Sequence, residues 1–317
     1  MSGEVLVWKN FHPVENAEYC ISVFERGFQY GDGFFTTALI KQSQLLNWSA
    51  HKARLQMSAK RLRFPELDFE TLEQSLRNQF ITYGQTDCVC KIMVTRGVGG
   101  RGYLPPETPD VQVLSMLMPV PDFKHQPDNV AQVSPIILEI SPETSGVKHL
   151  NRLSNVLARK TMNVGFDEAV MLNAFGQVQC ATQSNIFVIK DHQIITPRVN
   201  LSGVEGTARS CLLTLAKEQV LTMDDVLNAD TLFFTNAVRG VQVINNLNLN
   251  NWSNLQRKFL QFGLSQLQDL PAGICFPKVV GDEKSEIMKT FETKSPLLEK
   301  VQQAFLHHQY QNALKLN

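Results

Sequence analysis

A lysine between a strand-like run and a helical run is the feature that most limits how this chain can fold. Residues 133–140 (VSPIILEI) are apolar enough for a strand, and Leu153, Val156 and Leu157 recur at helical spacing after Lys148. Such a lysine can be an ordinary surface charge, or it can point into a space between two elements. An amine removed from water has a lowered pKa, is nucleophilic and forms Schiff bases with aldehydes.

Short runs typical of strands alternate with helical patterns in the first 119 residues. Apolar residues recur at helical spacing between basic ones in 50–63, which predicts an amphipathic helix. The segment Gly31-Asp32-Gly33 indicates a turn before a strand. The predicted helices cover 50–63 and 67–83, and the predicted strands cover 4–8, 20–24, 35–40, 43–47, 88–95 and 111–118.

A polar, proline-bearing stretch over 120–129 predicts a linker between two domains, as a length of 317 residues also favours. Residues 1–119 are the smaller domain, 130–275 the larger, and 276–317 an appended tail that is predicted to be helical. In the larger domain, helices are predicted at 149–163, 201–219, 224–229 and 254–267. Strand-like segments are predicted at 133–140, 168–172, 178–190, 194–196 and 231–235. An extended segment is predicted at 274–280.

Charge and cysteine usage exclude several classes of function. The 30 basic and 30 acidic residues cancel, which gives no sign of a nucleic-acid partner. The six cysteines lie mostly in apolar runs and lack the spacing of a zinc site, so we expect reduced thiols and no metal. The first ten residues lack the apolar core of a signal peptide, and no apolar run reaches 18 residues. We therefore predict a cytoplasmic protein without a membrane partner.

Three motifs are suited to binding anions, and each also has an ordinary structural interpretation. Arg54 can grip a phosphate with its guanidinium fork or be a surface cation. Gly206-Thr207 can present free N–H groups at a helix start or simply begin a helix. The loop Arg96–Tyr103 (RGVGGRGY) has four glycines and two arginines, which can fold over a carboxylate.

Taken together, these pieces resemble the fold type IV family of pyridoxal-phosphate enzymes. That family includes branched-chain and D-amino-acid aminotransferases and aminodeoxychorismate lyases, and the resemblance covers roughly residues 4–268. The resemblance rests on the order and spacing of the motifs more than on any single motif. The motifs most similar to the lyase branch are residues 29–37 (QYGDGFFTT), 49–51 (SAH), 96–103 (RGVGGRGY) and 148–153 (KHLNRL).

The resemblance implies a two-domain α/β (α+β) architecture with pyridoxal 5'-phosphate in the interdomain cleft, a small-molecule substrate and a homodimer. Lys148 matches the lysine that forms the Schiff base, and Arg54 the arginine that grips the cofactor phosphate. The resemblance also implies that Thr207, Ala208, Asn236 and Ala237 contact the cofactor phosphate. Thr36 and Thr37 lie on a strand near the cofactor, and the residues implied at the substrate are Tyr30, Arg101, Tyr103 and Arg152.

Cys180 departs from the family pattern. The family has a glutamate at this position, where it pairs with the pyridine nitrogen of the cofactor. A thiol, with an ordinary pKa of about 8.5, replaces that charge only if its pKa falls. Two interpretations follow: a lyase that tolerates a weaker electron sink because its product is aromatic, or a paralogue with altered or lost chemistry.

The resemblance implies a lyase that converts 4-amino-4-deoxychorismate to 4-aminobenzoate and pyruvate, a step in folate biosynthesis. Lys148 would serve as its general base. Two alternatives stay open. One is a class IV aminotransferase acting on branched-chain or D-amino acids. The other is a catalytically impaired paralogue that acts as a binding protein.

Overall fold

The computed structural model describes residues 5–15, 17, 21–123, 129–252, 254–255 and 288–316. The chain forms two compact units: unit 1 comprises 1–123, 147–151 and 306–317, and unit 2 comprises 124–146 and 152–305. The chain therefore passes from unit 2 into unit 1 and back again around Lys148. The domain limits inferred from sequence stay a prediction. Parts of that prediction, at 124–128 and across 256–287, lie outside the described residues, including most of the helix expected at 254–267 and the whole extended segment expected at 274–280.

Unit 1 is built on a seven-stranded sheet in the order β17-β4-β3-β5-β6-β1-β2. All pairs in it are antiparallel, and the longest ladder joins β3 to β5. The strands are β1 Leu6–Lys9, β2 His12–Pro13, β3 Gly33–Lys41, β4 Gln44–Leu45, β5 Cys88–Thr95, β6 Gln112–Met118 and β17 Leu314–Lys315.

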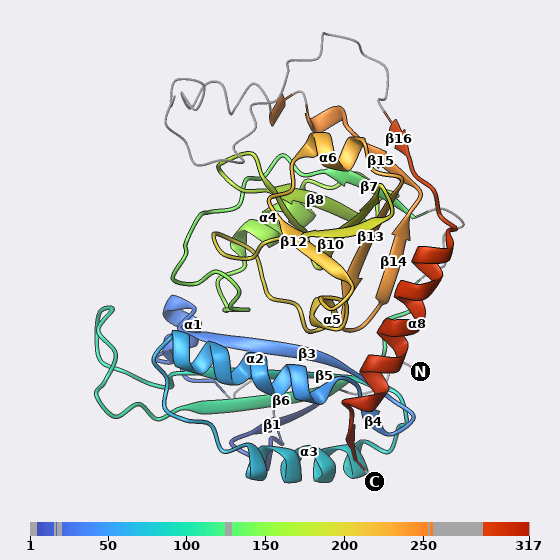
Figure 1. The fold of residues 1–317 in the computed structure, drawn as a ribbon. Helices are drawn as coiled ribbons and strands as arrows, with labels where there is room; N and C mark the ends of the chain where they lie inside the picture. Colours follow the sequence, from blue (N-terminus) through green and yellow to red (C-terminus); the bar gives the residue numbers. More distant parts are fainter. Residues whose placement is uncertain are drawn as a thin grey trace. The chain divides into compact units, whose positions relative to one another are not determined.

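Two helices, α2 (Trp48–Arg61) and α3 (Phe69–Tyr83), lie along this sheet (Figure 1). Side chains alternate along β3, so Phe34, Thr36 and Ala38 are buried while the residues between them are half-buried. The apolar members of this buried face pack with Leu55 of α2 in one cluster. The polar member, Thr36, is thereby held under α2.

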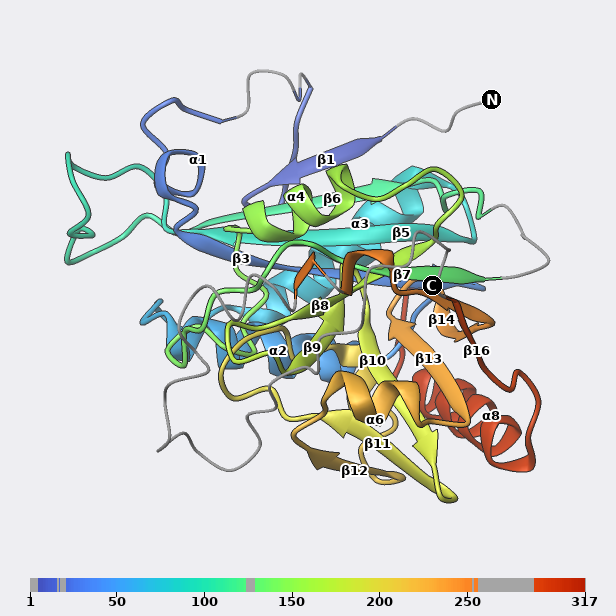
Figure 2. The same ribbon diagram turned by 90° about the horizontal axis from the view of Figure 1, so that it is seen from above.

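Unit 2 contains two five-stranded sheets in the orders β12-β11-β10-β13-β14 and β16-β15-β7-β8-β9. Figure 2 shows the first of these running from β12 to β14. The strands are β7 Val130–Val133, β8 Glu168–Leu172, β9 Val178–Ala181, β10 Asn185–Lys190, β11 Gln193–Pro197, β12 Ala216–Gln219, β13 Thr231–Asn236, β14 Gly240–Ile244, β15 Asn246–Asn248 and β16 Met288–Thr290.

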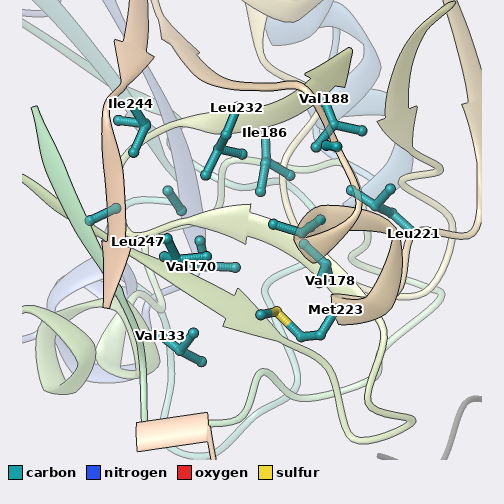
Figure 3. Packing of buried hydrophobic residues seen from close by; sticks show 14 of the residues in the cluster. Val133, Val170, Val178, Ile186, Val188, Leu221, Met223, Leu232, Ile244 and Leu247 are labelled. Atoms are coloured by element: carbon teal, nitrogen blue, oxygen red, sulfur yellow. The ribbon is translucent and has the colours of Figure 1, made fainter. Parts of the chain in front are cut away.

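The main core of unit 2 lies between its two sheets. Figure 3 shows Val133 and Val170 of one sheet and Ile186 and Leu232 of the other among the apolar side chains that meet there. The outer faces have smaller clusters. Residues of α5 (Thr207–Ser210) and α8 (Pro296–Gln311) cover Phe187 and Phe233, and α4 (Leu153–Lys160) covers Met171. A further helix of this unit is α6 (Met223–Leu227).

The mixed α/β (α+β) class predicted from the sequence is confirmed, but three predicted elements are wrong. The strand expected at 133–140 ends at Val133, because Pro135 has no N–H to continue a ladder. Residues 21–24 form a turn, and Cys20 lies outside the described residues. That turn precedes α1 (Arg26–Tyr30), which begins where the Glu25 side chain accepts a bond from the N–H of Phe28.

The third error is the helix expected at 201–219. Only Thr207–Ser210 is α-helical, and 216–219 form β12, which pairs in parallel with β11. Residues 216–219 (AKEQ) favour a helix by propensity, so the strand partner overrides the local preference. Arg209 stabilises the pairing of β12 with β11, because it donates to the carbonyl of Pro197 in β11 at 2.9 Å and pairs with Glu218 in β12.

Helix α4 begins at Leu153, close to the predicted place, but its apolar face is not buried in unit 2. Leu153, Val156 and Leu157 are 69%, 59% and 45% exposed, while Ala158 is fully buried. The helical spacing in the sequence was therefore informative about the helix and not about which face packs.

Candidate active site

Lys148 is fixed by backbone pairing to β3. The N–H of Phe35 donates to the carbonyl of Lys148 at 2.9 Å, and the N–H of Leu150 donates to the carbonyl of Gly33 at 3.0 Å. The Lys148 side chain is half-buried, with its Nζ 4.6 Å from the centroid of the Phe35 ring. The amine thus lies over an aromatic face on the strand that also carries Thr36.

Arg54 lies in a buried polar chain in the same unit. Its Nη2 donates to Thr36 Oγ1, and Thr36 Oγ1 lies 2.7 Å from Nδ1 of His51. Arg54 is 8% exposed, so its interpretation as a surface cation is wrong. Thr37 points to the opposite face of β3 and takes no part in this chain of contacts.

The surroundings of His51 keep its imidazole neutral. Burial lowers its pKa well below the usual value, and the positive charges of Arg54 and Lys148 lower it further. Arg54 and Lys148 therefore both lie close enough to His51 to act on its charge. Sequence reasoning assigned no role to His51, although it precedes Arg54 by three residues and shares its helix face.

The loop that carries Arg101 and Tyr103 is tied to α1 by Arg26. The Arg26 guanidinium donates to the carbonyls of Gly102 at 3.1 Å and Tyr103 at 2.7 Å. The Tyr103 ring packs edge-on against Tyr30 with 5.5 Å between centroids, yet Tyr103 remains 86% exposed. Tyr30 and Tyr103 are thus brought together, and Arg101 is exposed on the same loop.

Asp32 is the centre of this arrangement. Its carboxylate accepts from Nε of Arg26 at 2.8 Å and from Nε of Arg96 at 2.9 Å. Arg96 also donates to the carbonyls of Leu62 and Arg63, and it stacks on Phe64 at 4.0 Å. Arg96 is therefore part of the support, while Arg101 is at the exposed part of the loop.

In unit 2, Thr207 and Ala208 form the first turn of α5, next to Gly206. A side chain at position 206 would place its Cβ 1.9 Å from Oδ1 of Asn185, so the Asn185 side chain would have to move. Because α5 has only four residues, its dipole is much weaker than the sequence prediction assumed. An anion at this turn would meet its backbone N–H groups and the Thr207 side chain.

Asn236 ends β13, and its side chain is occupied in holding the turn that contains Ala237. Its Oδ1 accepts from the N–H groups of Val238 and Arg239, at 3.0 and 2.7 Å. Its Nδ2 donates to Ser184 Oγ at 3.1 Å. A ligand at this turn would therefore meet backbone groups rather than the Asn236 amide.

One buried hydroxyl of unit 2 has the character of an anion ligand. Thr235 Oγ1, one residue before Asn236, is buried and has no hydrogen-bond partner among the described residues. Thr235 shares its strand face with Phe233, which packs in the same cluster as Ala208 of α5. An unsatisfied buried hydroxyl is costly, so this donor beside α5 fits a site for a phosphate group. Sequence reasoning missed it because threonine is common in strands.

Cys180 lies on β9 in an apolar cluster with Leu138, Ala158 and Met171. Arg152 is near it: burial lowers the pKa of Arg152 to about 10, and a negative charge on the Cys180 sulfur would raise it. Two predicted site residues are thus neighbours within unit 2. Across the ranges that the structure describes, no three His, Cys, Asp or Glu side chains gather as metal ligands, and no helix is long and apolar enough to cross a membrane.

Comparison with known proteins gives concordant findings. The family described as amino-transferase class IV matches residues 33–247. An aminodeoxychorismate lyase of Vibrio harveyi is 33% identical over 234 residues, which cover 70% of this chain and 86% of that protein. A putative branched-chain-amino-acid aminotransferase of Methanocaldococcus jannaschii is 30% identical over 241 residues, covering 72% and 83%.

Solved structures have the same architecture. The crystal structure of 4-amino-4-deoxychorismate lyase from Pseudomonas aeruginosa has a TM-score of 0.70 at 30% identity, over 76% of this chain and 91% of that chain. A branched-chain amino acid aminotransferase from Escherichia coli has a TM-score of 0.74 at 20% identity and covers both chains fully, which shows a shared fold.

Proposed function

The chain belongs to the class IV aminotransferase family, and on that premise we propose that it is a pyridoxal-phosphate-dependent lyase that converts 4-amino-4-deoxychorismate to 4-aminobenzoate and pyruvate. The observation that carries the proposal is the placement of Lys148. Its backbone is fixed on β3, and its amine influences the same buried imidazole as Arg54. An amine and a guanidinium held on one unit suit a phosphate-bearing aldehyde.

The remaining contacts are assigned to residues of each unit. Arg54 would grip the cofactor phosphate from unit 1. In unit 2, Thr207, Ala208, the turn Asn236-Ala237 and the unsatisfied Thr235 hydroxyl would bind it. Cys180 would face the ring nitrogen. The substrate carboxylates would meet Arg101 or Arg152, and Tyr30 and Tyr103 would line the substrate side.

When bound, pyridoxal phosphate supplies an aldehyde that captures an amine and a ring that accepts electrons. Lys148 would remove the proton from the carbon that bears the substrate nitrogen. The bond between the substrate ring and the enolpyruvyl oxygen would break, with the electron pair leaving on the oxygen and the product ring becoming aromatic. The proton held by Lys148 would then go to the methylene carbon of the released enolpyruvate, which gives pyruvate. Arg101 and Arg152 would orient the substrate through its carboxylates and would not transfer protons, because arginine stays charged.

A class IV aminotransferase is the second candidate. Its support is the 30% identity to the putative branched-chain enzyme and the further similarity to D-alanine aminotransferases. It would return the amine to a keto acid, which demands protonation of the cofactor and therefore a strong contact at its ring nitrogen. Cys180 is a weaker partner than a carboxylate at that atom, which favours the lyase.

The homodimer also stays a proposal. Large apolar side chains are exposed around α1 and the 97–104 loop: Val23, Phe24, Phe28, Val98, Tyr103 and Leu104. A second copy that covered them would explain their exposure.

Absorbance and pyruvate release test the function. We expect the purified chain with pyridoxal phosphate to show the absorbance of lysine-bound cofactor and to release pyruvate from aminodeoxychorismate. Lys148→Ala should abolish both, with a rate loss of about a thousandfold or more. Lys91→Ala is the matched control, because the Lys91 amine lies 5.1 Å from the same Phe35 ring. Absorbance without pyruvate favours the aminotransferase, and no absorbance favours the binding protein.

A further inference from the structure

In the polar chain His51–Thr36–Arg54, chemistry fixes the direction of one hydrogen bond. A guanidinium only donates, so Thr36 Oγ1 is the acceptor of the bond from Arg54 Nη2. The Thr36 hydroxyl has one proton of its own, and His51 Nδ1 lies 2.7 Å from the oxygen. Where this proton points at Nδ1, that nitrogen is unprotonated, and the proton of a neutral ring is then on Nε2.

All three side chains are closed off from water. Thr36 is 0% exposed, His51 1% and Arg54 8%. They come from two elements, β3 and α2, which pack in one core. In such surroundings Thr36 cannot turn to a water molecule, so the hydrogen-bond direction at Nδ1 decides which lone pair of Oγ1 faces Arg54.

We propose that His51, as the neutral tautomer with its proton on Nε2, is a positioning residue that orients the Arg54 guanidinium through Thr36. Protonation at Nδ1 would reverse the bond, because Oγ1 would then face two donors and its own proton would lose its acceptor. The inference rests on the proposed function in one respect, namely that Arg54 binds the cofactor phosphate.

The charges around His51 act in the same direction. Arg54 on its own helix and Lys148 on the segment 147–151 are both cations, and Thr36 on β3 is uncharged. A second proton on the ring would add a third positive charge to this group. These charges therefore keep the ring neutral even at pH values below the usual pKa range of histidine.

Nitrogen NMR on the full chain tests the tautomer without cofactor. With ¹⁵N-labelled histidine, we expect His51 Nδ1 to resonate as an unprotonated nitrogen and Nε2 as a protonated one, from pH 8 to below 6.5. The Arg54 Nη protons should be resolved in the parent and averaged in Thr36→Val and His51→Gln. A protonated Nδ1 at pH 7.5, or unchanged Arg54 signals in both variants, would overturn the proposal.

Binding of pyridoxal phosphate, measured by calorimetry, tests the consequence. His51→Gln offers no acceptor at the Nδ1 position and should weaken binding by about threefold to tenfold, as loss of a neutral hydrogen bond does. His51→Asn places a carbonyl oxygen near that position and should restore most of the affinity. Adding His51→Gln to Thr36→Val should bring little further loss, because both act on one bond. Equal affinity in His51→Gln and the parent would contradict the inference.

Two controls separate this inference from the proposed function. His307→Gln makes the same replacement at an exposed position on α8 and should change nothing. If the parent binds no pyridoxal phosphate, the proposed function fails. The positioning role is then decided by the Arg54 signals alone.

Discussion

Asp32 in unit 1 and Glu168 in unit 2 are both carboxylates surrounded by protein, and different donors hold them. Asp32 lies between the guanidinium groups of Arg26 and Arg96. Glu168 accepts from the Thr182 hydroxyl, from Ser184 Oγ at 2.9 Å and from the N–H of Gln183 at 3.2 Å. Charged donors therefore hold one carboxylate, while the donors that hydrogen-bond to the other are neutral.

This difference shows how each unit supports its part of the site. The Asp32 group fixes a loop whose far end, Tyr103, is exposed. Ser184 Oγ donates to the Glu168 carboxylate and accepts a hydrogen bond from Asn236 Nδ2, at the turn after β13. A flexible, glycine-rich loop needs strong charged contacts to be ordered, whereas a turn at a strand end is already ordered by the sheet.

The largest expected effect is that of Asp32→Asn. The amide cannot balance two buried guanidinium groups, so we expect the free energy of unfolding to fall by about 3 kcal/mol. The side-chain exposure of Asp32 is only 17%, so solvent compensates little. Urea unfolding followed by tryptophan fluorescence measures this, with the exposed Glu66→Gln as control. A loss equal to that of the control would show that the ion pairs do not stabilise the loop.

Glu168→Gln should have a smaller effect, of about 1 kcal/mol, because it alters bonds to neutral donors. The size of this loss in stability depends on pH. Burial raises the pKa of Glu168 above 4.5, and the bonds from Thr182 and Ser184 offset this only in part. The folded state thus holds the proton longer than the unfolded state, so the parent loses stability as pH rises from about 4.5 through the folded-state pKa.

The variant lacks this titration. We therefore expect Glu168→Gln to lose most stability relative to the parent near pH 4 and least near pH 8. Thermal unfolding at both pH values measures the difference, and Glu139→Gln, an exposed position in the same unit, is the control. A constant difference between parent and variant across this range would show that the pKa of Glu168 is the same in the folded and unfolded states.

The sequence predicted most elements of both units because their periodicity is local. Strand β5 and strand β8 were predicted with the limits that the structure has, since each is an apolar run bounded by turn residues. Helix α5 and strand β12 were not, because the pairing of β12 with β11 joins residues about 20 positions apart in the sequence. Local propensity contains no information about such a partner.

The same limit applies to the site. Lys148 and Arg54 were identified through motifs, but the sequence did not show that Thr36 and His51 join Arg54 in one chain of contacts. Nor did it separate Arg96 from Arg101, which share a loop and have opposite exposure. Spacing along the chain identified which residue types were available, and packing decided which of them act together.

Cys180 sharpens the comparison, with an expected effect on stability no larger than that of Glu168. Cys180 packs among apolar side chains, with the charged Arg152 nearby. Cys180→Ala removes one sulfur from this cluster and should cost about 1 kcal/mol. Cys90→Ala, at a fully buried thiol of β5, should cost about the same.

The two variants should differ only in the cofactor spectrum. If the Cys180 thiol faces the ring nitrogen, then Cys180→Ala changes how the absorbance of bound pyridoxal phosphate varies with pH, and Cys90→Ala does not. Cys180→Glu should change that absorbance further, because a carboxylate favours a protonated ring nitrogen more strongly than a thiol does. Identical spectra for all three variants would place Cys180 away from the ring, and its departure from the family pattern would then have no chemical consequence.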